Sequence, residues 1–238
     1  MTGRAATVLA LSLLAVSAPV FGQDGGAMKT EQTGVSRTIV VIGASYAGGW
    51  NPERPLAGHQ IITKGVSGEE SSQVRDRFAG DVIALKPHGV IIWGFINDIF
   101  RSDRARLTER LQRTRNDLVF MVESARKAGI VPILATEVTI RNKDGWAEAT
   151  ASVVGRILGK ESYQEYINRH VSAINEWIRE TAAREKILLL DFERALSDER
   201  GVRRKEFAKP DGSHISSQGY EALTRYADER LTAISTAK

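Results

Sequence analysis

Three residues of the sequence have the types and spacing that nucleophilic catalysis requires. Ser45 follows the apolar run TIVVIG within a stretch of small residues, and Asp211 and His214 lie three residues apart near the C-terminus, in DGSH. A serine hydroxyl is a poor nucleophile until an adjacent base takes its proton. An imidazole can do so when a carboxylate on its other nitrogen fixes the tautomer. Ser45, Asp211 and His214 are therefore candidate catalytic residues.

Two further segments supply groups that could stabilise an oxyanion. GVSGEES contains Gly68, and GFIND contains Asn97; each follows an apolar run. Attack on an ester carbonyl gives a tetrahedral intermediate whose oxyanion needs preorganised donors. The backbone N–H groups of Ser45 and Gly68 and the side-chain amide of Asn97 could provide them. Glycine suits position 68 because the backbone itself must approach the substrate there.

Alternating strand and helix patterns would position these residues. Five short apolar runs are typical of parallel strands buried on both faces: TIVVIG, HQIITKGV, GVIIWGF, IVPILATEV and KILLLDF. Helical patterns cover residues 69–85, 103–128, 162–184 and 217–234. The alternation predicts a single three-layer α/β/α domain over residues 37–238 with a five-stranded parallel sheet. The carboxyl ends of parallel strands meet at one edge, so the candidate residues would share one cleft.

Taken in order, the segments GASY, GVSGEES, GFIND and DGSH resemble the four sequence blocks of the SGNH hydrolases, also called GDSL-like esterases and lipases. The resemblance spans residues 39 to about 225. It implies a flavodoxin-like fold and hydrolysis of carboxylic esters through an acyl-serine intermediate. It also implies that Ser45 is the nucleophile, that His214 is the base oriented by Asp211, and that Ser45, Gly68 and Asn97 form the oxyanion hole.

Two positions depart from the family pattern. Ala44 stands where the first block usually has an aspartate, which is not the partner of the histidine, so the triad is retained. Phe95 stands where the third block usually has a glycine, and its ring is expected either to narrow the acyl side of the cleft or to shift Asn97, so that short acyl groups are favoured. The connection 141–161 is too long for a simple turn, and we expect either a substrate-choosing lid or an idle insertion. Phe95 and Trp146 are the expected substrate-binding residues.

The N-terminus has the layout of a secretory signal peptide. Arg4 precedes the apolar run ATVLALSLLAVSAPV, and VFGQ offers small residues for cleavage after Gly22. The run is short for a membrane-spanning helix, which needs about 20 apolar residues; an uncleaved anchor is the alternative. We therefore expect a signal peptide over residues 1–22 and a flexible lead-in over residues 23–36. The expected location is periplasmic or secreted, with no stable membrane insertion after cleavage.

Composition argues against several other classes. The 238 residues carry a formal net charge of +4, and the basic residues are scattered among acids, without the basic stripe and interleaved aromatics of a nucleic-acid interface. The absence of cysteine excludes disulfides and thiolate metal sites. No acids or histidines show a metal-ligand spacing, so we expect no metal and no cofactor. The basic run 200–209 is either a solvated loop or a rim for an anionic substrate.

The sequence also allows simpler roles for the candidate residues and other functions for the protein. Taken singly, Ser45 and Asn97 could cap helices, and Asp211 could begin a turn; Asp98 stays unassigned. The expected substrate is a small-molecule, glycan or lipid ester. One alternative is an O-acetyltransferase or acetylesterase of envelope polysaccharide that uses the same acyl-serine. Another is a non-catalytic binding domain on the same scaffold, because a fold does not fix a function.

Overall fold

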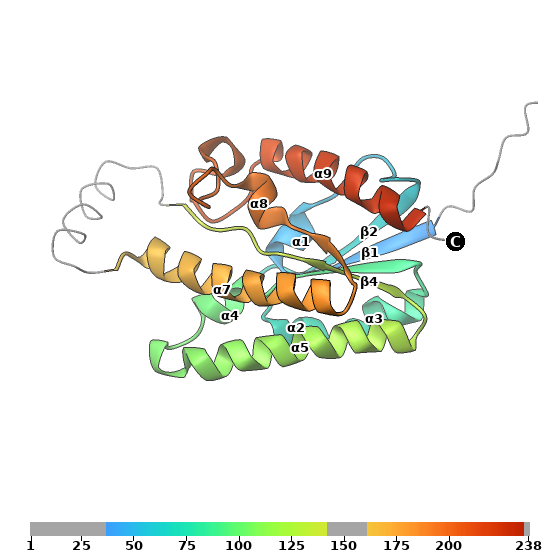
Figure 1. The fold of residues 1–238 in the computed structure, drawn as a ribbon, viewed down its shortest axis with the longest axis horizontal. Coiled ribbons are helices and arrows are strands. Elements are labelled where there is room, and N and C mark those ends of the chain that lie inside the picture. Colours follow the sequence, from blue (N-terminus) through green and yellow to red (C-terminus); the bar gives the residue numbers. More distant parts are fainter. Residues whose placement is uncertain (1–36, 142–160, 236–238) are drawn as a thin grey trace, which may run out of the picture. The chain divides into compact units, whose positions relative to one another are not determined.

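The fold is built around a five-stranded parallel sheet (Figure 1). A computed structural model of the protein describes residues 37–141 and 161–235, with side chains up to residue 232. The strand order is β2-β1-β3-β4-β5. The strands are β1 (Arg37–Gly43), β2 (His59–Gly65), β3 (Gly89–Trp93), β4 (Val131–Ala135) and β5 (Leu188–Leu190). This sheet confirms the fold class expected from the sequence.

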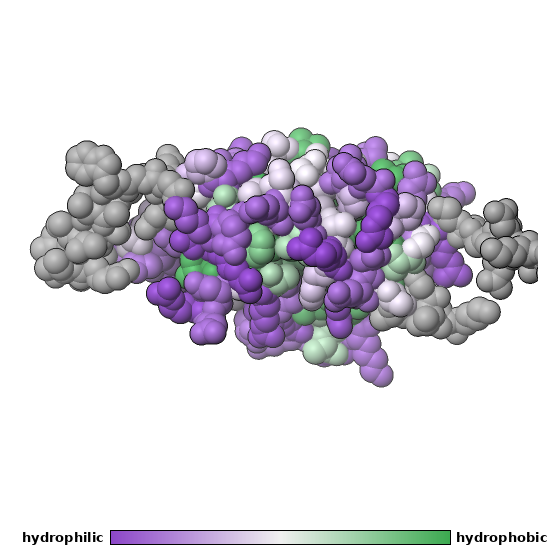
Figure 2. Space-filling view, turned by 90° about the horizontal axis from the view of Figure 1, so that it is seen from above, coloured by the Kyte–Doolittle hydropathy of each residue, from purple (hydrophilic) through white to green (hydrophobic). Residues whose placement is uncertain are grey.

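Helices cover both faces of the sheet. Below it in Figure 1 lie α2 (Ser71–Asp76), α3 (Phe78–Asp81) and α5 (Leu107–Lys127). Helix α7 (Tyr163–Arg184) packs beside α5. Above the sheet lie α8 (Phe192–Leu196) and α9 (Ser217–Ser235). The short helices α1 (Ser45–Gly49) and α4 (Ile96–Phe100) follow β1 and β3, and 3-10 turns occur at Ile83–Leu85, Arg104–Arg106 and Lys205–Phe207. Seen from above, the described surface is mostly hydrophilic, with small groups of apolar residues between (Figure 2).

The central strands form the core because both of their faces are covered. Residues 39–42 of β1 and 90–93 of β3 are at most 1% exposed, which explains their continuous apolar sequence. The parallel register pairs Gly43 with Gly65 on one side and with Trp93 on the other. The three strands therefore end level with one another, and the segments that follow them emerge side by side.

The helices agree with the sequence expectations except in one place. Helices α5, α7 and α9 lie where the periodic patterns predict them. The single helix expected over residues 69–85 is wrong, because the chain breaks into α2, α3 and a 3-10 turn. Arg77, at the break between α2 and α3, donates to Glu69, to Asp81 and to the carbonyl oxygen of Gly43. These bonds tie the break to the end of β1.

Several sequence expectations fall outside the described residues. These are the signal peptide (residues 1–22), the lead-in (residues 23–36) and the interior of the 141–161 connection, including Trp146. Within residues 37–141 and 161–235, no helix combines the length and apolar character needed to cross a membrane.

The small residues around Ser45 are explained by close approach of the backbone. A Cβ atom on Gly43 would lie 1.6 Å from the carbonyl oxygen of Trp93, and one on Gly65 would lie 1.9 Å from the backbone nitrogen of Gly48. Real Cβ atoms do not come so near to backbone atoms, so larger residues would push α1 and the neighbouring strand ends apart. Glycine at these two positions lets α1 pack directly on β2.

We predict that Gly43→Ala destabilises the protein by about 3 kcal/mol or more, because the added methyl overlaps a strand backbone that cannot move aside. Gly80→Ala is the matched control, since a Cβ at that helical position meets no atom within 4 Å, and it should change stability by about 1 kcal/mol at most. Urea unfolding midpoints measure both effects. Equal midpoints for the two variants would show that the close approach has no energetic consequence.

Candidate active site

Ser45 lies immediately beyond β1, as the first residue of α1. The cap of this helix is Ala44, and no side chain caps it. Tyr46 and Ala47 are buried, which anchors the turn, whereas Ser45 is only half-buried. The simpler interpretation of Ser45 as a helix-capping serine is therefore not supported. Its hydroxyl sits on a fixed backbone turn at the carboxyl edge of the sheet.

Asp211 and His214 form a bonded pair on one turn. Oδ2 of Asp211 lies 2.7 Å from Nδ1 of His214, and Oδ1 accepts the backbone N–H groups of Ser213 and His214 at 2.9 and 2.8 Å. Burial alone would raise the pKa of Asp211, but the bonds from His214 and Ser213 outweigh it and hold the pKa well below its usual range. An ionised carboxylate only accepts hydrogen bonds. The Nδ1 atom of a neutral His214 therefore carries the proton, which leaves Nε2 as the basic nitrogen.

The turn of Ser45 and the loop of His214 are joined through neighbouring residues. The Tyr46 hydroxyl donates to the carbonyl oxygen of Ser213 at 2.6 Å, and the Tyr220 hydroxyl donates to the carbonyl oxygen of Tyr46 at 3.1 Å. Residues 167 positions apart in the chain thus touch. The structure records no hydrogen bond between the Ser45 hydroxyl and the His214 ring. In enzymes without substrate, such catalytic bonds are often long and tighten on binding.

Arg203 supports the histidine loop from inside. Its Nη2 atom donates to the carbonyl oxygens of Gly212 and Ser213 at 2.7 and 2.8 Å. Its side chain is fully buried, and burial lowers its pKa. Arg203 lies in the basic run 200–209, for which a rim against anionic substrates was one interpretation. A buried guanidinium cannot contribute to such a rim.

The two other oxyanion-hole candidates meet in space. Nδ2 of Asn97 donates to the carbonyl oxygen of Glu69 at 2.8 Å, which ties α4 to the loop that contains Gly68. This bond takes one of the two amide hydrogens and leaves the other available. Gly68 has a positive φ of 82°, a conformation that favours glycine. Asn97 is not the cap of α4, whose cap position is Phe95.

Phe95 is held in the core by a residue that sequence reasoning missed. Its side chain is 1% exposed, so the expected substrate contact is not supported, since a ring in this position has almost no surface to offer. Oε1 of buried Glu137 accepts the backbone N–H groups of Phe95 and Ile96 at 2.7 and 3.2 Å. The signal for Glu137 in the sequence is an acid near the end of the run IVPILATEV.

Glu137 is also fixed from the other side. Its backbone N–H donates to Asn175 of α7 at 2.9 Å, and the Asn175 amide donates back to the carbonyl oxygen of Glu137 at 2.8 Å. Burial raises the pKa of Glu137 to about 7, against the effect of the two N–H donors. Glu137 therefore links α7 to the start of α4, the helix that carries Asn97.

Asp98, left unassigned from the sequence, has a structural role. Its carboxylate accepts the backbone N–H of Ser71 at 2.8 Å, the Ser71 hydroxyl at 2.7 Å and the Thr114 hydroxyl at 3.0 Å. These bonds connect α4 with α2 and α5. Burial raises the pKa of Asp98, although the bonds from Ser71 oppose it. The side chain is 1% exposed and takes no part in the candidate site.

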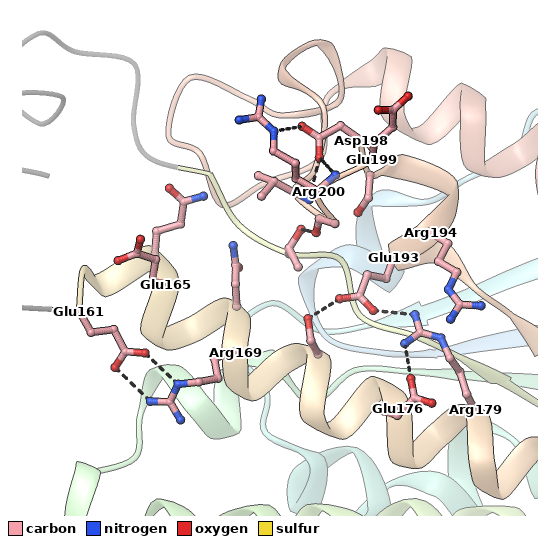
Figure 3. Close-up of a pocket in the computed structure, with 17 residues that line it drawn as sticks. Glu161, Glu165, Arg169, Glu176, Arg179, Glu193, Arg194, Asp198, Glu199 and Arg200 are labelled. Atoms are coloured by element: carbon pink, nitrogen blue, oxygen red, sulfur yellow. Dashed lines mark hydrogen bonds and ion pairs between the residues drawn. The ribbon is translucent and has the colours of Figure 1, made fainter. Parts of the chain in front are cut away.

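A cavity of about 810 Å³ lies elsewhere, between α7 and the segment after α8 (Figure 3). Ser45, Gly68, Asn97 and His214 do not line it. Its charged groups largely bond one another: Arg179 with Glu193, and Arg169 with Glu161. Charged side chains that already form ion pairs within the protein gain little from binding a ligand. Among the described residues, no group of three or more acids or histidines could hold a metal ion.

The comparisons with known proteins agree with this architecture. The model of the GDSL-like Lipase/Acylhydrolase family matches residues 40–222. The chain therefore belongs to this family. The parallel sheet and the candidate site agree with this class of protein.

Individual relatives are more distant. YqeF of Bacillus subtilis strain 168, named as an uncharacterized lipoprotein, is 36% identical over 87 residues, which are 36% of this chain and 35% of that protein. A GDSL-like lipase from Bacteroides thetaiotaomicron has a TM-score of 0.62 at 22% identity, over 84% of this chain and 89% of that one. A lipase/acylhydrolase from Enterococcus faecalis has a TM-score of 0.58 at 21% identity, over 83% and 96%. These structures show a shared fold.

Glu137 should make stability depend on pH. Between the ordinary glutamate value of 4.5 and about 7, the folded state holds a proton on Glu137 that the unfolded state has lost. Stability must therefore fall as pH rises through this window. Glu137→Gln keeps an acceptor for Phe95 and Ile96 but does not titrate. Relative to this variant, the native protein should lose about 3 kcal/mol between pH 4.5 and 7.5.

Urea unfolding of both proteins across this pH range measures the difference. The comparison with the glutamine variant cancels the contribution of titrating groups that do not interact with Glu137; Asp98 and Arg203 interact with it electrostatically, so the measured difference includes their coupling to Glu137. Parallel curves for the two proteins would show that the Glu137 carboxyl is already ionised in the folded state below pH 5.

Proposed function

We propose that the protein is a serine hydrolase that cleaves carboxylic esters through an acyl-serine intermediate. The observation that carries the proposal is the 2.7 Å pair of Asp211 and His214, held by the Tyr46–Ser213 bond against the turn of Ser45. Membership of the GDSL-like Lipase/Acylhydrolase family, whose model match covers all of these residues, supports it.

The reaction would proceed in two stages. Nε2 of His214 takes the proton of Ser45 while the serine oxygen attacks the ester carbonyl. The backbone N–H groups of Ser45 and Gly68 and the Asn97 amide donate to the oxyanion. The carbon–oxygen bond of the leaving group then breaks, and His214 returns the proton to the departing alcohol. Water, deprotonated by His214, attacks the acyl-serine and releases the acid.

Asp211 stays ionised throughout and steadies the imidazolium that forms on His214. The low pKa of Asp211 suits this role, because the carboxylate does not take the proton itself. Its two bonds to backbone N–H groups of Ser213 and His214 keep the turn in place while the charge on the ring changes.

Short acyl esters are the first substrates to test. The rings near the strand ends, Trp50, Trp93 and Phe95, are at most 1% exposed and pack in the core. Rings placed in this way fill the interior and do not form walls for a long acyl chain.

Export through an N-terminal signal peptide completes the proposal. Residues 1–22 have the basic start, apolar run and small residues of such a peptide. The partial relative YqeF is named a lipoprotein. The present chain has no cysteine, so a lipid on an N-terminal cysteine is not available to it. We therefore propose cleavage after Gly22 and release into the periplasm or the medium.

Replacing the nucleophile tests the activity. Ser45→Ala should lower kcat for 4-nitrophenyl acetate by at least about 10⁴-fold, since the acyl-enzyme cannot form. Ser67→Ala is the matched control, because Ser67 is an exposed serine in the nearby Gly68 loop, and it should retain most of the activity. Equal unfolding midpoints would show that both variants are folded. Undiminished turnover by Ser45→Ala would remove Ser45 from the mechanism.

A further inference from the structure

Arg101 lies against the backbone of the proposed oxyanion hole. It follows Asn97 by four residues, and its backbone N–H donates to the Asn97 carbonyl oxygen, so the two side chains leave the same side of α4. The Asn97 amide reaches Glu69. Nη2 of Arg101 lies 2.8 Å from the place that a Cβ atom on Gly68 would take. The guanidinium thus occupies the space that glycine leaves open at position 68.

Acids near this loop already have partners. Glu69 pairs with Arg77 at 2.7 Å, Glu70 pairs with Arg110 at 2.6 Å, and the Asp98 carboxylate is buried against Ser71. By contrast, no hydrogen bond or ion pair joins the Arg101 guanidinium to another residue within 37–141 and 161–235.

One nearby carboxylate could compete for Arg101. Asp103 lies two residues further along, but its side chain is 80% exposed and its ion pair, at 4.0 Å, is with Arg106. The structure records no ion pair between Asp103 and Arg101, and interactions of so exposed a carboxylate are largely screened by solvent. A cation therefore stands beside the candidate oxyanion donors, and none of the acids around it neutralises it directly.

A guanidinium in this place has a specific chemical preference. Its planar fork of N–H donors matches a carboxylate, to which it can donate two parallel hydrogen bonds. At the edge of the site, such a group would attract an anion carried by the substrate more than it would stabilise a neutral ester.

We propose that Arg101 determines specificity by binding a carboxylate on the substrate, next to the ester bond that is cleaved. The preferred substrates are then esters in which the acyl or the alcohol part carries a negative charge. This inference rests on the proposed esterase function and adds to it the class of substrate.

Matched pairs of charged and neutral esters test the proposal. On the alcohol side the pair is 4-acetoxybenzoate and 4-acetoxybenzamide; on the acyl side it is mono-4-nitrophenyl adipate and its methyl ester. The measured quantity is the ratio of kcat/KM for the charged ester to that for the neutral one. Within each variant the neutral ester serves as the reference, which removes effects on folding and on the catalytic step.

Arg101→Gln should lower this ratio about tenfold for at least one pair, and Arg101→Lys should lower it less, because lysine keeps the charge and loses the fork. Arg126→Gln removes the same charge near the C-terminal end of α5, where Arg126 pairs with Glu185. That variant should keep the native ratio, which separates local binding from the effect of net charge. The native ratio should also fall with added salt.

The outcomes separate the two proposals. If the native protein cleaves the neutral esters and Arg101→Gln leaves both ratios unchanged, the role of Arg101 is wrong and the esterase function stands. If Arg126→Gln lowers the ratio as much as Arg101→Gln does, the preference comes from net charge and the role of Arg101 is again wrong. If none of the four esters is cleaved, the esterase function fails and the substrate class fails with it.

Discussion

The carbonyl oxygen of Ser213 is the point at which the two ends of the candidate site are joined. It accepts the Tyr46 hydroxyl at 2.6 Å and the Arg203 guanidinium at 2.8 Å. Tyr46 follows the candidate nucleophile, and Ser213 precedes the candidate base. Both donors are buried, where a donor without a partner would cost about 1–3 kcal/mol. Loss of either hydrogen bond would therefore lower the stability of the protein, and the two bonds fix the position of His214 relative to Ser45.

Buried polar groups fix the remaining parts of the site in the same way. Glu137 holds the start of α4, and Asn97 on that helix reaches the loop of Gly68. Asp98 ties α4 to α2 and α5. Each of these hydrogen bonds replaces a bond to water with a bond of fixed direction. Their main effect is therefore to position the bonded groups, and their contribution to stability is smaller. Preorganised donors of this kind are what an oxyanion hole needs.

Much of the fold could be predicted from the sequence, because strands buried on both faces leave continuous apolar runs such as TIVVIG. The short helices α1 and α4 could not, since five residues are too few to show a helical period. The break at Arg77 was missed for a different reason: its partners Glu69, Asp81 and the end of β1 come together only in the folded chain.

The candidate site shows the same division. Ser45, Asp211 and His214 could be predicted because each is defined by its type and by its place after a strand or before a helix. Glu137, the burial of Arg203 and the burial of Phe95 could not, because local sequence does not say which side chains the packed core will enclose. The sequence does not show that the guanidinium of Arg101 lies against Gly68, because only the fold brings the two residues together.

Labelling with a fluorophosphonate tests the central claim most directly, because this reagent reacts with a serine whose proton an adjacent base can remove. Intact-mass and peptide analysis of the native protein should show one added phosphonyl group, on Ser45, and His214→Gln should slow its addition at least about 100-fold. Labelling at another residue, no labelling, or an equal rate in His214→Gln would contradict the pairing of Ser45 with His214.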